Sequence, residues 1–259
     1  MCGRFVITSA PAAIREAFGY LDQPNFPSRY NIAPTQPIPV VMIDQGARRF
    51  RLMRWGLLPS WVKDPRTFTL LINARAETVF EKPAFRNAIR RRRCLVPADG
   101  YYEWRTIGPR KQPYFIHPQG GGPIGFAALW ETWVGPNGEE LDTVAIVTTA
   151  AAGAMADLHD RVPVTIAHDD FARWLDGDEQ DVSAAATLLR PPRDGVFVWH
   201  PVSTEVNRVA NDNAQLILPI EADQMAAPPA PAAAAPKRAT RPKPPAKLAT
   251  DDGGQGSLF

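Results

Sequence analysis

A cysteine stands at the second position of the chain, in the segment MCGRF. Removal of the start methionine would leave Cys2 with a thiol and a free α-amine on neighbouring carbons. Because an α-amine has a pKa of about 8, against about 10.4 for lysine, far more of it is neutral and nucleophilic at pH 7. The thiol, with a pKa of about 8.5, can also be activated, although most free cysteines are buried and inert. Cys2 is therefore a candidate nucleophile that needs partner groups.

Three polar residues in other segments could supply those partner groups. Glu103 lies in the aromatic segment YYEW, where enclosure would raise its pKa into the range of a general acid or base. His159 titrates near neutral pH, and Asn73 can both donate and accept hydrogen bonds. Each also has a structural interpretation: an outward-facing glutamate, a core histidine, or an asparagine that stabilises a turn. Only their convergence in space would give them a functional role.

The sequence contains no motif typical of a metal site or of a phosphate-binding loop. The four histidines and two cysteines are dispersed and have none of the spacings typical of a metal site. The glycine run at residues 120–122 follows no strand-to-helix pattern, so it indicates a turn. We therefore expect neither a metal nor another cofactor.

Composition indicates a globular protein without a membrane segment. The 259 residues are 45% hydrophobic and 22% charged, enough for one large core or two small ones. The chain has no run of about 18 apolar residues and no cleavable leader, so we expect a cytoplasmic protein. In that compartment Cys2 and Cys94 should stay unpaired, with Cys94 in the core.

The net charge of +2 gives no general attraction to nucleic acids, so DNA binding would need a local basic patch. The most basic segment is residues 86–93. It is equally well explained as a solvated helix end, where cations are favourable.

Strand patterns dominate the middle of the chain. Segments rich in β-branched and aromatic residues and bounded by turn signals predict strands at residues 38–43, 48–56, 94–105, 112–118, 124–134 and 141–151. Helices are predicted at residues 11–20, 81–92, 168–175 and 181–190. No βαβ alternation and no internal repeat is present. We expect an α+β fold with a curved, barrel-like, mainly antiparallel sheet that helices decorate.

The composition changes after the segment QLILPI. Residues 226–250 are dominated by alanine, proline, lysine and arginine and contain no aromatic residue, which predicts disorder. We expect a catalytic domain at residues 1–220, a disordered linker at 221–254 and a separate short motif at 255–259.

Seven motifs occur together and in a familiar order: MCGRF, RYNIAPTQ, MRWGLLPSW, INARAET, RRCLVPADGYYEW, KQPYF and HDRVPV. Through them, residues 2–220 resemble the SOS response-associated peptidase (SRAP) family, the abasic-site-processing proteins. The resemblance implies that Cys2 is the catalytic residue after loss of Met1, and that Asn73, Glu103 and His159 are its partners. It also implies a substrate, an abasic site in single-stranded DNA, and an association with the nucleoid.

The chemistry of Cys2 suits that substrate. The α-amine would add to the open aldehyde of the abasic sugar, and the thiol would then close a thiazolidine ring, giving a covalent link that shields the lesion. We assign Glu103 to proton transfer, His159 to opening of the sugar ring and Asn73 to orientation of the amine. One alternative is a cysteine peptidase that uses Cys2 and His159 and can cleave its own chain. The other is a protein that binds modified DNA bases without forming a covalent bond.

Further residues are candidates for contacts with the DNA strand. Arginine forks suit phosphates, and the indole of Trp104 can either stack on a base or pack in the core. The expected DNA-binding residues are Arg4, Arg75, Trp104, Thr148 and Arg161. We expect Trp55 and Trp61 to be structural and the protein to be a monomer.

The final segment QGSLF resembles the short bacterial motif that docks into the replication sliding clamp. Leu258 and Phe259 would fill an apolar pocket of the clamp, and Gln255 would make polar contacts. A linker of about 30 residues would present this motif at a high effective concentration. Chance is the alternative, since a five-residue pattern is weakly specific.

Overall fold

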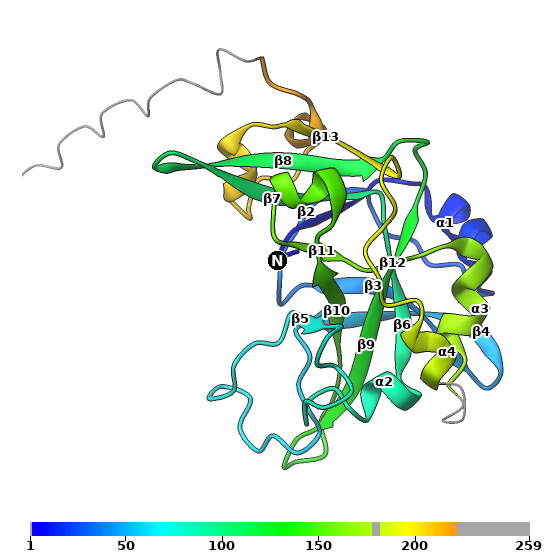
Figure 1. Ribbon diagram of the computed structural model, residues 1–259. Helices are drawn as coiled ribbons and strands as arrows, with labels where there is room; N and C mark the ends of the chain where they lie inside the picture. Colours follow the sequence, from blue (N-terminus) through cyan, green and yellow to red (C-terminus); the bar gives the residue numbers. More distant parts are fainter. Residues whose placement is uncertain (1, 178–181, 222–259) are drawn as a thin grey trace, which may run out of the picture. The chain divides into compact units, whose positions relative to one another are not determined.

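Strands outnumber helices in the regular secondary structure, and short helices surround them (Figure 1). The computed structural model describes residues 2–177 and 182–221. The predicted linker after residue 221 and the segment with Gln255, Leu258 and Phe259 lie outside the described residues. The arrangement confirms the predicted α+β class.

Five strands close into a barrel: β3 (Pro37–Asp44), β4 (Ala47–Trp55), β6 (Arg93–Ala98), β9 (Ile124–Val134) and β10 (Glu140–Ala150). Four of the five pairings around the ring, β4 with β3, β3 with β6, β6 with β9 and β9 with β10, are antiparallel. The ring is completed by a parallel pairing of β10 with β4. The barrel-like, mainly antiparallel sheet is therefore confirmed.

Three short strands extend the barrel. β5 (Asn73–Arg75) lies parallel to the second half of β10, and β11 (Arg161–Pro163) lies antiparallel to the end of the same strand. β12 (Thr165–Ile166) pairs with β9. The long strand β10 thereby holds two of the segments with candidate site residues.

A second, antiparallel sheet contains β13 (Phe197–Pro201), β8 (Arg110–Pro118), β7 (Gly100–Ile107), β1 (Phe5–Ile7) and β2 (Arg29–Ile32), in that order. The single strand predicted at 94–105 is in fact two strands, because the chain leaves the barrel at the end of β6 and enters this sheet as β7. The motif ADGYYEW therefore connects the two sheets (Figure 1).

The helices are short. The helix predicted at 11–20 is confirmed as α1 (Pro11–Phe18), which ends at Gly19 in the left-handed conformation. The others are α2 (Ala88–Arg91), α3 (Phe171–Leu175), α4 (Val182–Ala186) and the 3₁₀ helices η1 (Gly153–Asp157), η2 (His168–Asp170), η4 (Thr204–Asn207) and η5 (Ala214–Ile217). In the parts of the chain that the structure describes, no helix is long and apolar enough to cross a membrane.

The helix predicted at 81–92 is wrong for its first half, where the chain forms turns and only α2 is helical. Pro83 lacks a backbone N–H and cannot continue a helical hydrogen-bond ladder. The arginines at the end of this segment do not all face solvent. Arg93 is buried and donates to the carbonyls of Ile89, Arg90 and Trp174, so residues 86–93 do not form one solvated basic patch.

The core fills the barrel and the space between the barrel and the second sheet. Trp55 and Cys94 are fully buried, as predicted, and Phe5 from β1 packs edge to face on Trp55 and Phe126 of the barrel. Trp61, for which we also expect a structural role, packs edge to face on Phe68 but is 58% exposed, so it lies outside the core.

The start of the chain is held by Asp99, the residue between β6 and β7. Its carboxylate accepts hydrogen bonds from the backbone N–H groups of Thr8 and Ser9, at 2.5 and 2.7 Å, and from the Ser9 hydroxyl. This contact fixes the end of β1 against the crossing between the sheets, and so helps to position the residues that precede β1.

Replacing Asp99 with alanine should lower the free energy of unfolding by about 1–3 kcal/mol, because two backbone donors lose their acceptor. Urea unfolding would measure this loss. The matched control is Asp157→Ala, at an exposed aspartate of η1, which should change stability by less than about 0.5 kcal/mol. Equal effects of the two substitutions would contradict the role assigned to Asp99.

Candidate active site

The first residues of the chain lie between the two sheets. Arg4 accepts a hydrogen bond from the backbone of Tyr102 on β7, at 3.0 Å. On the other side, the side-chain amide of Asn73, from β5, donates to the carbonyl of Cys2 at 2.9 Å. Cys2 is fully buried. Two elements that are far apart in the sequence therefore hold the candidate nucleophile.

Pairing with β10 determines how Asn73 is presented. Asn73, Ala74 and Arg75 lie opposite Ile146, Val147 and Thr148, so side chains alternate between the two faces. The indole of Trp55 supports the strand by donating to the carbonyl just before Asn73, at 2.9 Å. The side-chain oxygen of Asn73 is buried and has no hydrogen-bond partner among the described residues, so it can accept one from an incoming group.

Glu103 and His159 face each other at the same site. Glu103, on β7, is 2% exposed, and its Oε2 lies 3.6 Å from Nε2 of His159. His159 lies in the loop between η1 and β11 and is partly exposed. The pair connects a buried carboxyl to a group that reaches solvent, which provides a route for protons.

Burial raises the pKa of Glu103 to about 7, and the negative charge of Asp160 acts in the same direction. Burial lowers the pKa of His159, although Asp160 partly opposes this shift. Glu103 can therefore exchange protons near neutral pH, as acid–base catalysis requires, and the shift at His159 favours the neutral form of its ring.

Two neighbours contact the His159 ring at Nδ1. The backbone N–H of Arg161 donates to Nδ1 at 3.0 Å, and Oδ1 of Asp160 lies 2.8 Å from the same atom. These contacts leave Nε2, the other ring nitrogen, on the side of Glu103.

Burial and the negative charge of Glu103 raise the pKa of the Cys2 thiol. This direction is opposite to that of cysteines that attack as preformed thiolates. The thiol is therefore suited to react in a second step, after a more nucleophilic group has engaged the substrate.

Arg161 has a carboxylate partner in the protein. Its two terminal nitrogens contact the two oxygens of Glu77 at 2.7 and 3.0 Å, and one of them also donates to the carbonyl and hydroxyl of Thr148. The ion pair lowers the pKa of Glu77 to about 2. Thr148 is fully buried. Arg161 and Thr148 thus lie together beside β5, with the charge of Arg161 balanced by Glu77.

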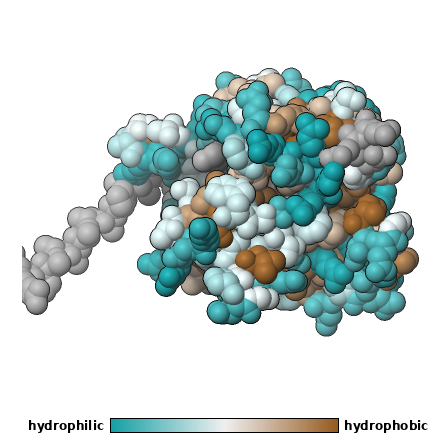
Figure 2. All heavy atoms as spheres, turned by 90° about the horizontal axis from the view of Figure 1, so that it is seen from below, coloured by the Kyte–Doolittle hydropathy of each residue, from teal (hydrophilic) through white to brown (hydrophobic). Residues whose placement is uncertain are grey.

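Arg75 is in a different situation. It is exposed and lines a groove of about 580 Å³ that also includes Asn73. The remaining lining residues are Trp61, Phe68, Leu71, Thr78, Lys82, Pro83, Ala84 and Phe85. Aromatic and basic side chains in one groove suit the bases and phosphates of a single strand. In the view of Figure 2, from below, hydrophobic areas are separated by hydrophilic ones.

Arg4 and Trp104 lie on the other side of β7. The guanidinium of Arg4 donates to the side chain of Asn31 at 2.6 Å and to the carbonyl of Val206 at 2.8 Å. Trp104 donates to Asn207 at 2.8 Å and packs in a small separate hydrophobic cluster. The structure therefore does not bring these two residues together with Glu103, which faces the opposite side of the strand.

Sequence reasoning missed three residues at or near the site. Trp61 lines the groove, Glu77 pairs with Arg161, and Tyr101 is buried on the same face of β7 as Glu103. All three lie in the motifs MRWGLLPSW, INARAET and RRCLVPADGYYEW. Alternation along YYEW could have placed Tyr101 beside Glu103, but nothing in the sequence connects Glu77 to Arg161.

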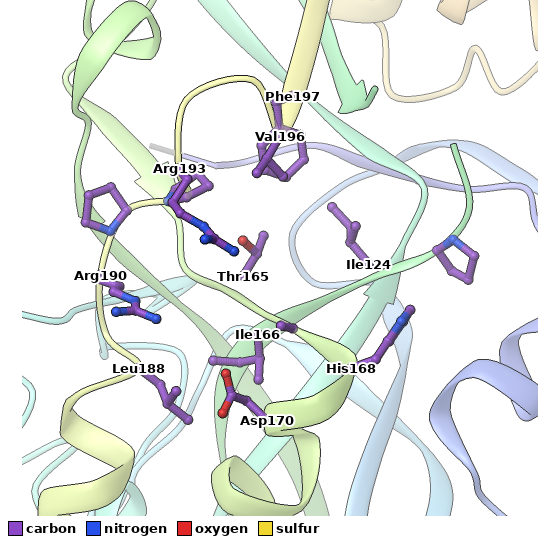
Figure 3. A pocket seen from close by; sticks show the side chains of 14 residues that line it. Ile124, Thr165, Ile166, His168, Asp170, Leu188, Arg190, Arg193, Val196 and Phe197 are labelled. Atoms are coloured by element: carbon purple, nitrogen blue, oxygen red, sulfur yellow. The ribbon is translucent and has the colours of Figure 1, made fainter. Parts of the chain in front are cut away.

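A second pocket, of about 330 Å³, lies between β12 and the segment before β13 (Figure 3). Arg190 and Arg193 line it together with Asp170, so it carries charges of both signs. It contains none of the four candidate catalytic residues. Within the described ranges, no group of three or more histidine, cysteine, aspartate or glutamate side chains could hold a metal ion.

Comparison with known proteins finds relatives that share one description, abasic site processing protein. The abasic site processing protein YoqW of Bacillus subtilis is 37% identical over 221 residues, which cover 84% of this chain and 99% of the relative. The abasic site processing protein YedK of Escherichia coli is 34% identical and covers 85% of this chain and 100% of its own length. The abasic site processing protein HMCES of Gallus gallus is also 34% identical, over 85% of this chain and 78% of its own length.

Solved structures share the fold. A protein from Bacteroides thetaiotaomicron superposes with a TM-score of 0.75 at 24% identity and covers 85% of this chain. A phage-related protein from Bordetella bronchiseptica superposes with a TM-score of 0.64 at 34% identity, over 78% of this chain and 94% of its own. The family model described as SOS response associated peptidase (SRAP) matches residues 1–209. With this match over most of its length, the chain belongs to the SRAP family.

Proposed function

We propose that this protein processes abasic sites in single-stranded DNA by capturing them covalently through Cys2, after loss of Met1. The observation that carries the proposal is the contact of buried Cys2 with Asn73, near the Glu103–His159 pair. The names of the relatives, abasic site processing proteins, supply the substrate class.

The reaction joins an aldehyde to an aminothiol and releases water. The neutral α-amine of Cys2 attacks the aldehyde carbon, C1′, and the aldehyde oxygen becomes a hydroxyl group. Protonated Glu103 gives this hydroxyl a proton, it leaves as water, and a protonated imine remains beside the Glu103 carboxylate. The Cys2 sulfur then attacks C1′, the thiol proton passes to that carboxylate and restores the acid, and a five-membered thiazolidine ring closes.

The partner residues prepare these steps. His159, beside Glu103, exchanges protons with the ring oxygen as the closed sugar opens to the aldehyde. Asn73 fixes the Cys2 backbone, so that the amine approaches C1′ from one direction. Enclosure between the sheets limits access of water to the imine.

The DNA strand runs along the groove that contains Trp61 and Arg75. The exposed indole of Trp61 offers a stacking surface, and Arg75 offers a cation for a phosphate. Since Asn73 belongs to both the groove and the site, a strand bound there would lead directly to Cys2.

Two other functions fit the site less well. A peptidase that uses Cys2 as a thiolate would need a lowered thiol pKa, whereas burial raises it. A non-covalent reader of modified bases would have no use for a thiol beside an α-amine. Docking of Gln255, Leu258 and Phe259 into a sliding clamp stays a prediction from the sequence.

Covalent capture can be tested directly by intact mass. Incubation with a single-stranded oligonucleotide that carries one abasic site should give a heat-stable adduct with the mass of both partners minus one water. Cys2→Ala should abolish this adduct, because no thiol can close the ring. Retention of Met1 should be equally harmful, because it blocks the amine.

The matched control is Cys94→Ala, which removes the other buried cysteine and should leave the adduct unchanged. An adduct formed equally well on intact DNA, or by Cys2→Ala, would refute the proposal.

Capture should be fastest between about pH 7 and 8. The neutral fraction of the amine grows as the pH rises toward about 8. The protonated fraction of Glu103 falls as the pH rises above its pKa of about 7. Single-turnover rates from about pH 5 to 9 would show this optimum.

Glu103→Gln should slow capture by about 100-fold or more and remove the decline at alkaline pH, because the titrating acid is gone. A variant that kept the alkaline decline of the wild type would show that another group supplies the proton.

Binding should weaken as salt rises, with a slope of log K against log salt of about −0.7 per phosphate neutralised. Arg75→Ala should reduce the steepness of that slope by about 0.7. Fluorescence anisotropy with an intact oligonucleotide would measure it without capture. Arg173→Ala, on α3 and paired with Asp170, is the control and should leave the slope unchanged. The assignment of Arg75 fails if both variants give the wild-type slope.

A further inference from the structure

Tyr101 lies beside the candidate catalytic residues but has no part in the steps above. It is fully buried on β7, opposite Phe5 of β1, and shares a face of the strand with Glu103 two residues later. Its ring packs edge to face on Phe126 and Phe197, with centroids 5.9 and 6.1 Å away. These contacts fix the direction of the ring.

The hydroxyl of Tyr101 is buried without a hydrogen-bond partner among the described residues. A buried polar group in this state costs free energy, and phenylalanine would fill the same space without that cost. The next residue shows the usual arrangement, since the hydroxyl of Tyr102 donates to the carbonyl of Tyr30 at 2.8 Å. The hydroxyl of Tyr101 is therefore a donor that needs a partner which the described protein residues do not supply.

A second unpartnered polar atom belongs to the same site. The side-chain oxygen of Asn73 is also buried without a partner in the described structure, while its nitrogen holds Cys2. Residues on β5 and β7 that carry the site thus include one donor and one acceptor without a partner in the described structure. A ligand that carries the complementary groups would satisfy both atoms.

Resting on the function proposed above, we propose that Tyr101 is a further catalytic residue, whose hydroxyl donates a hydrogen bond to the oxygen on C1′ of the abasic sugar. This oxygen gains electron density when the amine attacks C1′, so a fixed donor stabilises it most at that moment. Glu103 then delivers the proton with which the oxygen leaves as water. Tyr101 keeps its own proton throughout.

The electrostatics of the site suit a donor that never ionises. Burial raises the pKa of Tyr101 well above its ordinary value, and the nearby ionisable groups of Cys2 and Glu103 act in the same direction. The hydroxyl stays protonated at every pH at which the amine and Glu103 are active. It can therefore donate a hydrogen bond but cannot replace Glu103 as an acid or a base.

The test compares Tyr101→Phe with Tyr102→Phe in the full chain, on a single-stranded oligonucleotide with one abasic site. Borohydride trapping reports formation of the imine, and heat-stable adduct reports ring closure. Tyr101→Phe should slow imine formation by about 10- to 100-fold without lowering the thermal midpoint, because it removes an unsatisfied hydroxyl and keeps the ring.

The pH profile separates a donor from a structural residue. In Tyr101→Phe the rate should fall by the same factor at every pH, with the optimum unchanged. In Tyr102→Phe the thermal midpoint should fall, since the bond to Tyr30 is lost, while the rate of imine formation stays within about twofold of the wild type.

The inference is overturned if Tyr101→Phe forms the imine as fast as the wild type, or if its slower rate is accompanied by a lower thermal midpoint or a shifted pH optimum. Wild-type protein that forms no adduct would instead refute the proposed function. The two failures are therefore distinguishable.

Discussion

The candidate site depends on how the first residues of the chain are held between the barrel and the second sheet. A chain end is ordinarily mobile, and a nucleophile placed there would lose much of its advantage to disorder. Here the Asn73 amide holds the carbonyl of Cys2, and the backbone of Tyr102 holds that of Arg4. Asp99 fixes the end of β1. Because these contacts come from two segments that are far apart in the chain, β5 and the crossing between the sheets, the residues from Cys2 to Ser9 are fixed like those of a core strand.

Burial of that chain start also sets the chemistry of its neighbours. The same enclosure raises the pKa of Glu103 to about 7, raises that of the Cys2 thiol and lowers that of His159. A carboxyl that is half protonated near neutral pH can first give and then take a proton. A thiol that stays protonated favours a reaction order in which the amine acts first. One physical cause, removal from water, therefore tunes several groups in directions that suit one reaction.

The arginines show that a cation in the sequence does not by itself indicate a binding site. Arg161 is paired with Glu77, Arg4 with Asn31 and a backbone carbonyl, and Arg93 with three backbone carbonyls in the interior. Arg75 lines the groove beside Asn73 and is exposed. A nearly neutral protein can bind a polyanion through a few such positions, provided that they lie along one path to the site.

Local sequence determined the types of the long elements and the identities of the chemical groups. The alternating segments at 38–43 and 124–134 became β3 and β9, and the motifs supplied Cys2, Asn73, Glu103 and His159. Tertiary structure decided the rest: the closure of the barrel by the parallel pairing of β10 with β4, the division of 94–105 into two strands, and the unpartnered hydroxyl of Tyr101. The physical reason is the distance along the chain over which each property is determined. Side-chain type and alternation are local properties, whereas burial, ion pairing and unsatisfied polar atoms depend on residues far away in the chain.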